Sequence, residues 1–145
     1  MIRPEISKKI GEAMKAGDKV RLETLKLLSS ALNYEFISKQ HELSEDEELA
    51  VVKREIKKRK DAIEAYLKVN QKERAEAEEK EMAILKEFLP EEASEEEISK
   101  VIDEAISQFG ASPANFGKIM GFVMGKMGNK VDGNTVSQLV RKKLA

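Results

Sequence analysis

The sequence contains no cysteine and no tryptophan, and its aromatic residues are limited to two tyrosines and five phenylalanines. The lack of cysteine excludes disulfides, cysteine nucleophiles and thiolate metal sites together. With so few aromatics, mostly at core spacing, we expect no platform on which unpaired bases of a nucleic acid stack. The single histidine, His41, lies in a polar stretch in which the sequence indicates no orienting partner. We therefore expect a solvated loop residue and no catalytic residue of the Ser-His or Cys-His kind.

Long apolar runs are also missing. No stretch approaches the roughly 18 apolar residues that a bilayer-spanning helix needs, and the first residues lack the apolar core of a secretory signal. The many carboxylates are typical of solvated helix faces rather than of a metal site, as in the run Glu76, Glu78, Glu79 and Glu81. We expect a soluble cytoplasmic protein with no membrane partner, no cofactor and no metal.

Helical periodicity, in contrast, runs through the whole chain, and no alternating strand pattern interrupts it. Four helices, two of them long, are predicted in residues 1–90. Gly17 is typical of a helix end and Asp18 of the next helix start, while Ser44 and Glu47 form a capping box for a long helix. Pro90 then marks a boundary between an N-terminal helical domain and a tail. The predicted fold class is all-α.

The tail, residues 91–145, has start signals for three short helices. The sequence predicts a second capping box at Ser94 and Glu97, the start of a glycine-bearing helix at Ser112 and Pro113, and the cap of the last helix at Asp132. So small a unit buries a limited core and depends on tight packing.

Charge is distributed unevenly between the two parts. Residues 111–145 contain six basic residues against Asp132 alone, a net charge of +5; because the whole chain carries −1, residues 1–110 carry −6. A basic tail on an acidic body is typical of proteins with an anionic partner, and it is equally compatible with lysines that only keep a small bundle soluble.

Five of the eight glycines fall within residues 117–133. Gly117, Gly121 and Gly125 recur every four residues, which places them on one face of a helix. Each glycine in a helix interior costs about 0.8–1 kcal/mol relative to alanine, so three on one face require a reason. The usual reason is that a neighbouring helix or an RNA backbone approaches closely.

The same stretch is not a phosphate-binding loop. Gly121 and the Gly125-Lys126 pair are one residue too close together for that motif, and no strand precedes them. Met127 also stands where a magnesium-binding hydroxyl is needed, so we expect no ATP binding there.

Three further stretches, spread over the N-terminal domain and the boundary at Pro90, match the pattern of a known family, so that the resemblance covers nearly the whole chain: residues 21–26 (RLETLK), 54–61 (REIKKRKD) and 89–91 (LPE). Together with residues 117–121 (GKIMG), Met124, Gly128, Lys130 and the Asp132-Gly133 pair, they resemble the YqeY family. Its members are freestanding relatives of the C-terminal tail of GatB, a component of the glutamyl/aspartyl-tRNA amidotransferase. Val131 departs from the alanine that the family often has before Asp-Gly.

The resemblance implies an all-helical protein with a longer N-terminal domain and a three-helix tail. In the amidotransferase the tail region helps to hold the tRNA, whereas the catalytic cradle, absent here, phosphorylates and amidates the aminoacyl end. The resemblance therefore implies a non-catalytic accessory that binds tRNA or a tRNA-processing complex. Two alternatives remain open: a helical protein-interaction module without RNA binding, and a carbon–nitrogen ligase activity with glutamine as amido donor, carried over from the larger enzyme.

Two surfaces are candidates for the RNA contact. The tail candidates combine lysines that neutralise phosphates with bare backbone that allows close approach: Lys118, Lys126, Lys130, Gly117, Gly121, Gly128, Asp132 and Gly133. The secondary candidates are closely spaced bases on one long helix: Lys53, Arg54, Lys57, Lys58, Arg59 and Lys60. A structural alternative stays open for each surface. On the tail the glycines can serve helix packing, and on the long helix the bases can pair with nearby acids, for instance Arg59 with Glu55 at i,i+4 spacing.

Overall fold

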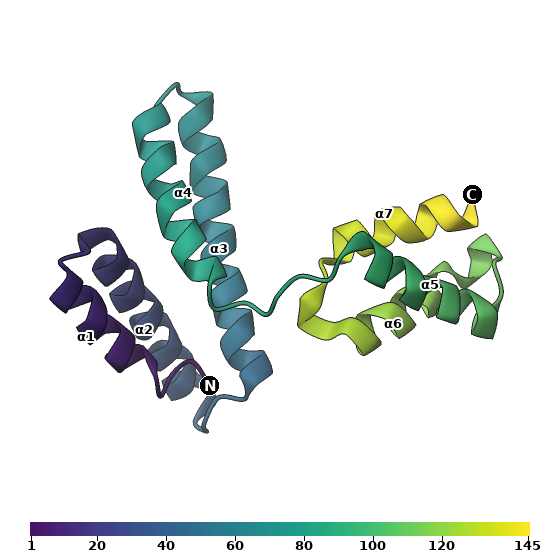
Figure 1. Ribbon diagram of the computed structural model, residues 1–145, viewed down its shortest axis with the longest axis horizontal. Helices are drawn as coiled ribbons and strands as arrows, with labels where there is room; N and C mark the ends of the chain where they lie inside the picture. The colour runs from purple at the N-terminus through teal and green to yellow at the C-terminus, as the bar shows by residue number, and fades with distance from the viewer. The chain divides into compact units, whose positions relative to one another are not determined.

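The computed structural model describes residues 1–145 and contains seven α-helices and no strand, which confirms the predicted all-α fold (Figure 1). The helices are α1 (Ile6–Ala16), α2 (Lys19–Lys39), α3 (Glu45–Lys68), α4 (Lys72–Lys86), α5 (Glu95–Phe109), α6 (Phe116–Met127) and α7 (Gly133–Leu144). Two short 3-10 turns, η1 (Pro113–Asn115) and η2 (Gly128–Lys130), flank α6. The chain divides into two compact units, unit 1 (Met1–Leu89) and unit 2 (Pro90–Ala145), which are described separately.

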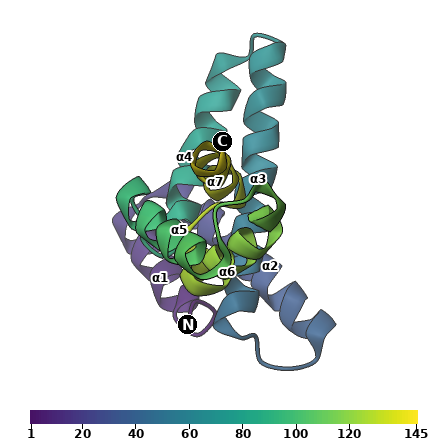
Figure 2. The same ribbon diagram turned by 90° about the vertical axis from the view of Figure 1, so that its right-hand side faces the viewer.

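Unit 1 consists of two helical hairpins, α1–α2 and α3–α4, and α2 packs against both helices of the second (Figures 1 and 2). Gly17 ends α1 in the left-handed conformation, with φ +68°, and the Asp18 side chain accepts a hydrogen bond from the Arg21 N–H at the start of α2. Ser44 and Glu47 form both bonds of the capping box that begins α3. All three predicted helix boundaries are confirmed.

The core of unit 1 is aliphatic, and two carboxylates of the unit, Glu48 and Glu55, are also buried. Its buried residues are Ile6, Leu28, Leu32, Leu43, Val51, Val52 and Leu85, and each contributes roughly 1.5–3 kcal/mol by leaving water. Glu48 is fully buried, and its carboxylate accepts hydrogen bonds from the backbone N–H groups of Ile2 (3.1 Å) and Arg3 (2.5 Å). These two bonds satisfy the buried charge and hold the first residues of the chain against α3.

Unit 2 packs α5, α6 and α7 around one small core of Ile98, Ile102, Ala105, Ile119, Val123, Val131, Val136 and Val140. Its helix starts differ in detail from the predicted ones. The Ser94 hydroxyl caps α5 by accepting from the Glu97 N–H, but the Glu97 carboxylate makes no return bond to the Ser94 N–H, so only half of the predicted capping box is formed. Ser112 and Pro113 start the η1 turn instead of α6, because the Ser112 hydroxyl accepts from the Ala114 N–H within that turn.

The last helix start is also a correction. Asp132 occupies the N-cap position of α7, but its side chain makes no capping hydrogen bond. A carboxylate there still complements the positive end of the helix dipole, so the position favours an acid even without that bond.

Candidate nucleic-acid interface

Helix α6 carries the densest set of predicted site residues, and its orientation in unit 2 decides which of them reach solvent. Ile119 and Val123 are fully buried and point into the core. At 100° per residue, Gly117, Gly121 and Gly125 lie on the opposite side, and all three are exposed. We call these three glycines the glycine face. The face is directed to solvent along most of the length of α6.

The glycine face does not serve packing within unit 2, and that part of the sequence interpretation is wrong. A Cβ atom added at any of its three glycines meets no atom within 4 Å apart from the adjacent residues and the backbone of its own helix. Glycines that let two helices approach closely have neighbours at that distance. The cost of about 0.8–1 kcal/mol for each glycine is therefore unexplained by the unit's own fold.

The three predicted lysines of the tail lie in different environments. Lys118 is exposed next to the glycine face and forms no ion pair, and Lys130 is likewise exposed without an ion pair after the end of α6. Lys126 instead pairs with Glu104 of α5 and lies 5.8 Å from the centre of the Phe122 ring. Two of the three ammonium groups are thus available to an anionic partner without breaking a contact.

The other predicted tail residues belong to the turn between α6 and α7. Gly128 ends α6 with φ +57° and ψ −126°, a conformation that essentially only glycine adopts. The backbone conformation alone therefore explains why a glycine stands at position 128. Lys130, Asp132 and Gly133 follow, and the Lys130 carbonyl accepts a hydrogen bond of 2.9 Å from the Ala93 N–H. This bond ties the turn to the segment that precedes α5.

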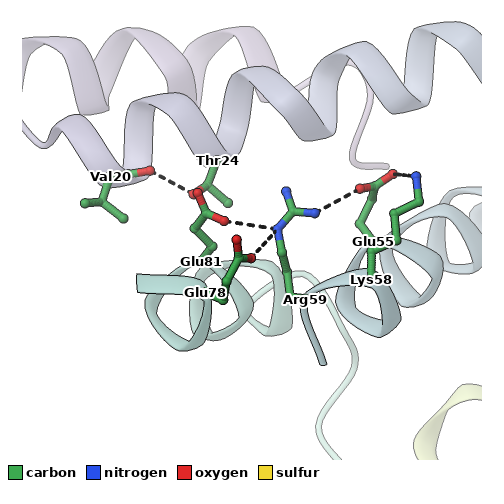
Figure 3. Close-up of polar contacts among 7 residues, drawn as sticks. All are labelled: Val20, Thr24, Glu55, Lys58, Arg59, Glu78 and Glu81. Atoms are coloured by element: carbon green, nitrogen blue, oxygen red, sulfur yellow. Dashed lines mark hydrogen bonds and ion pairs between the residues drawn. The ribbon is translucent and has the colours of Figure 1, made fainter. Parts of the chain in front are cut away.

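Several bases of the secondary basic surface on α3 form ion pairs with acids of the protein itself. Arg59 is only 12% exposed and joins α3 to α4, because its guanidinium lies 3.4 Å from Glu55, 3.1 Å from Glu81 and 3.6 Å from Glu78 (Figure 3). The Glu55–Arg59 pair that the spacing suggested is confirmed. Lys58 also pairs with Glu55, at 3.3 Å.

The remaining bases of this surface are more open. Arg54 pairs with Glu35 at 3.3 Å, while Lys53, Lys57 and Lys60 are exposed on α3. Of these, Lys57 and Lys60 form no ion pair. Arg59 is a structural cation, so the surface that α3 offers to an anion is smaller than its sequence suggests.

The carboxylates around Arg59 repel one another. Burial raises the pKa of the Glu78 carboxyl, and the neighbouring Glu81 charge raises it further, while the Arg59 charge opposes both. Arg59 therefore stabilises unit 1 by offsetting a repulsion between acids of α4. The opposite shift occurs at Glu87, where a hydrogen bond from Arg21 lowers the pKa of the carboxyl.

His41 lies in the α2–α3 loop with its side chain 56% exposed, in agreement with a solvated residue. The ring nevertheless has partners that the sequence did not indicate, because Nδ1 lies 2.8 Å from the Glu42 carbonyl oxygen and Nε2 lies 3.7 Å from the Glu47 carboxylate. No three His, Cys, Asp or Glu side chains lie close enough together to hold a metal ion. None of the helices combines the length and the apolarity that a membrane crossing requires.

Comparison with known proteins matches residues 3–144 to the YqeY family, described as Yqey-like protein. The chain belongs to the YqeY family. Over 89 residues it is 39% identical to the uncharacterized protein C22F3.15 of Schizosaccharomyces pombe, and this match covers 61% of the chain and 72% of that protein. The match to the family covers both units, so the glycine face and the α3 surface belong to the same family region.

One pair of residues in this YqeY-family chain could not be foreseen from the sequence. The Arg141 guanidinium of α7 lies 5.5 Å from the centre of the Phe116 ring at the start of α6. No local pattern joins residues so far apart in sequence, and only the packing of α6 against α7 brings them together.

Proposed function

We propose that the chain is a non-catalytic accessory that binds tRNA, alone or within a tRNA-processing complex, through the glycine face of α6. The observation that carries the proposal is that Gly117, Gly121 and Gly125 face solvent with nothing within 4 Å of an added Cβ. A helix surface without side chains lets a partner come close to the backbone. Since no part of unit 2 uses that access, an external partner is the reason that remains.

Charge favours RNA as that partner. Lys118 borders the glycine face and Lys130 follows α6, and both are free to neutralise phosphates. Residues 111–145 carry a net charge of +5, so the surroundings of the face attract an anion. The YqeY family is related to the C-terminal region of GatB, and the resemblance implies tRNA holding for that region.

A direct binding measurement tests the proposal. Fluorescence anisotropy with labelled tRNA is recorded between about 50 and 200 mM salt, a range over which phosphate contacts weaken strongly. We expect the Lys118→Gln/Lys130→Gln variant to bind more weakly and to show a smaller dependence on salt, by about 0.7–0.9 in the logarithmic slope for each phosphate contact that the substitutions remove. Wild-type protein with no salt-sensitive tRNA binding overturns the proposal.

A charge-matched control separates a specific contact from general attraction. Lys15 and Lys72 are exposed in unit 1 and form no ion pair. The Lys15→Gln/Lys72→Gln variant therefore removes the same charge from another part of the chain. Equal reductions of affinity in the two variants contradict a site on α6.

The same bare face can also accept a helix of a partner protein, because helices approach closely over glycines at four-residue spacing. A pull-down from nuclease-treated lysate distinguishes the two functions. Recovery of one protein partner that depends on the glycine face, together with no tRNA binding by the purified chain, favours the protein-interaction module.

The third class, a carbon–nitrogen ligase with glutamine as amido donor, predicts a glutamine-dependent product from the purified chain. We expect no such product, because amidation in the larger enzyme belongs to a cradle domain, whereas residues 3–144 match the YqeY family. Product formation by the chain alone contradicts the non-catalytic assignment.

A further inference from the structure

Unit 2 contains a shallow cavity of about 330 Å³, widely open to solvent, at the point where the start of α6 meets the end of α7. It is lined by Pro113, Phe116, Arg141, Leu144 and Ala145. A volume of this size lies at the lower end of the range for ligand pockets, which suits one small ring system rather than an extended molecule.

The lining combines a flat aromatic surface with an unpaired cation. The Arg141 guanidinium lies 5.5 Å from the centre of the Phe116 ring, within the range of a cation–π contact. Arg141 is exposed and forms no ion pair, so its charge and its five N–H donors are available to a ligand. Pro113 and Leu144 add aliphatic walls, and no acidic side chain lines the cavity.

A cavity in unit 1 provides the contrast. It measures about 370 Å³ and lies between α2 and α4. Two lysines, Lys19 and Lys80, line it together with four carboxylates, so acids outnumber bases in the lining: Glu23, Glu73, Glu76 and Glu81. That lining disfavours any ligand attached to phosphates. The lining of the cavity at Phe116 and Arg141 instead contains one basic side chain and no acidic side chain.

We propose that the cavity at Phe116 and Arg141 receives one unstacked base of the RNA that the glycine face binds, an inference that rests on the proposed function. Proteins read single-stranded bases by stacking them on aromatic rings or on guanidinium planes, and both surfaces are present here. A phosphate alone gains nothing from the aliphatic walls, whereas a base gains from walls, ring and guanidinium together. Phe116 directly precedes Gly117, so the cavity lies at the N-terminal end of α6, on a side of the helix turned about 100° from Gly117.

A base in this cavity adds one stacking contact to recognition of the RNA backbone, although the aromatic content of the sequence predicts no stacking platform. Phe116 is only half-buried, and the residue that completes the stacking surface, Arg141, comes from another helix. One stacking site needs one accessible ring face, not an aromatic-rich sequence.

Two variants keep the charge or the apolar character of the site while they remove its stacking surfaces. Phe116→Leu removes the ring face, and Arg141→Lys removes the guanidinium plane but keeps the positive charge. We expect Phe116→Leu to weaken tRNA binding about 5- to 150-fold, the size of one base-stacking interaction. Arg141→Lys weakens it at least about fivefold on the same scale. Neither variant changes the salt dependence, because both leave the phosphate contacts in place.

Two matched substitutions serve as controls. Phe122→Leu removes a second half-buried ring of α6 that packs edge-on against Phe109, 6.1 Å away and outside the cavity. Arg74→Lys alters the guanidinium that lies 5.9 Å from the Tyr66 ring in unit 1. We expect both to bind tRNA like the wild type, and thermal melts of all four variants identify any loss of folding.

The outcomes separate this inference from the function on which it rests. If Phe116→Leu and Arg141→Lys are folded and bind tRNA like the wild type while Lys118→Gln/Lys130→Gln binds weakly, the base pocket is refuted and the proposed function stands. If wild-type protein binds no tRNA, the proposed function fails first. If free nucleoside monophosphates bind the cavity as tightly as tRNA binds the chain, the pocket is a nucleotide site and the RNA-base assignment is wrong.

Discussion

Replacement of the glycine face by alanine is expected to separate stability from function. In Gly117→Ala/Gly121→Ala/Gly125→Ala, each added methyl group enters open space, because no residue lies within 4 Å of the new Cβ. Gly121 lies in the interior of α6, where the substitution removes a helix-propensity penalty of about 0.8–1 kcal/mol, whereas Gly117 and Gly125 lie in the first and last turns, where the penalty is smaller. We expect unit 2 to be stabilised by roughly 1–2 kcal/mol in total, as long as the three sites act independently.

The same three methyl groups are expected to obstruct an RNA backbone on the glycine face, and we predict at least about a tenfold loss of tRNA affinity, or about 1.4 kcal/mol. Hydrogen exchange of the α6 and α7 amides measures the stability of unit 2 without contribution from unit 1. Fluorescence anisotropy measures binding on the same samples.

Gly11→Ala in α1 is the matched control, since a Cβ at Gly11 also meets nothing within 4 Å. It is expected to stabilise unit 1 by about 1 kcal/mol and to leave tRNA binding unchanged. A triple alanine variant that is less stable than the wild type would show that the face packs against the protein itself. A stabilised variant that binds tRNA normally would refute the glycine face as the contact.

Three further predictions concern conformation and pH. Gly128→Ala destabilises unit 2 by about 1–3 kcal/mol, measured by the same hydrogen exchange, because alanine is strained at φ +57° and ψ −126°; an unchanged stability contradicts the structural role. Glu78→Gln raises the free energy of unfolding of unit 1 at pH 7 but not at acid pH, as measured by urea titrations. Folding raises the pKa of Glu78, so the stability that its protonated carboxyl contributes below the unfolded-state pKa is lost as the pH rises through the folded-state pKa; equal effects at both pH values refute this coupling. Glu87→Gln lowers the free energy of unfolding of unit 1 above the unfolded-state pKa of Glu87 and leaves it unchanged at acid pH, because Arg21 lowers the pKa of Glu87 in the folded chain; a larger loss of stability at acid pH contradicts this prediction.

Local signals in the sequence located the helix boundaries well where one residue alone determines the geometry. Gly17 supplies the left-handed turn after α1, and Ser44 caps α3 through its own hydroxyl. Pro90 coincides with the division between the two compact units. Asp132 was placed correctly at the start of α7, but whether its side chain bonds depends on a rotamer that sequence does not fix.

The site was predictable only in part, because it depends on which helix face the core selects. The spacing of Gly117, Gly121 and Gly125 predicted one face, but not that the face points to solvent, which follows from the burial of Ile119 and Val123. The basic run on α3 likewise could not reveal that α4 supplies two carboxylates to Arg59. Contacts between distant segments are set by tertiary packing, which single-sequence periodicity does not encode.

The most direct measurement of the central claim is an NMR titration of the ¹⁵N-labelled chain with tRNA, in which the backbone amides of individual glycines are resolved. We predict the largest shifts or line broadening at Gly117, Lys118, Gly121 and Gly125, with little change at Gly11 in unit 1. Changes confined to unit 1, or saturable tRNA binding that leaves the amides of α6 unperturbed, would contradict the account.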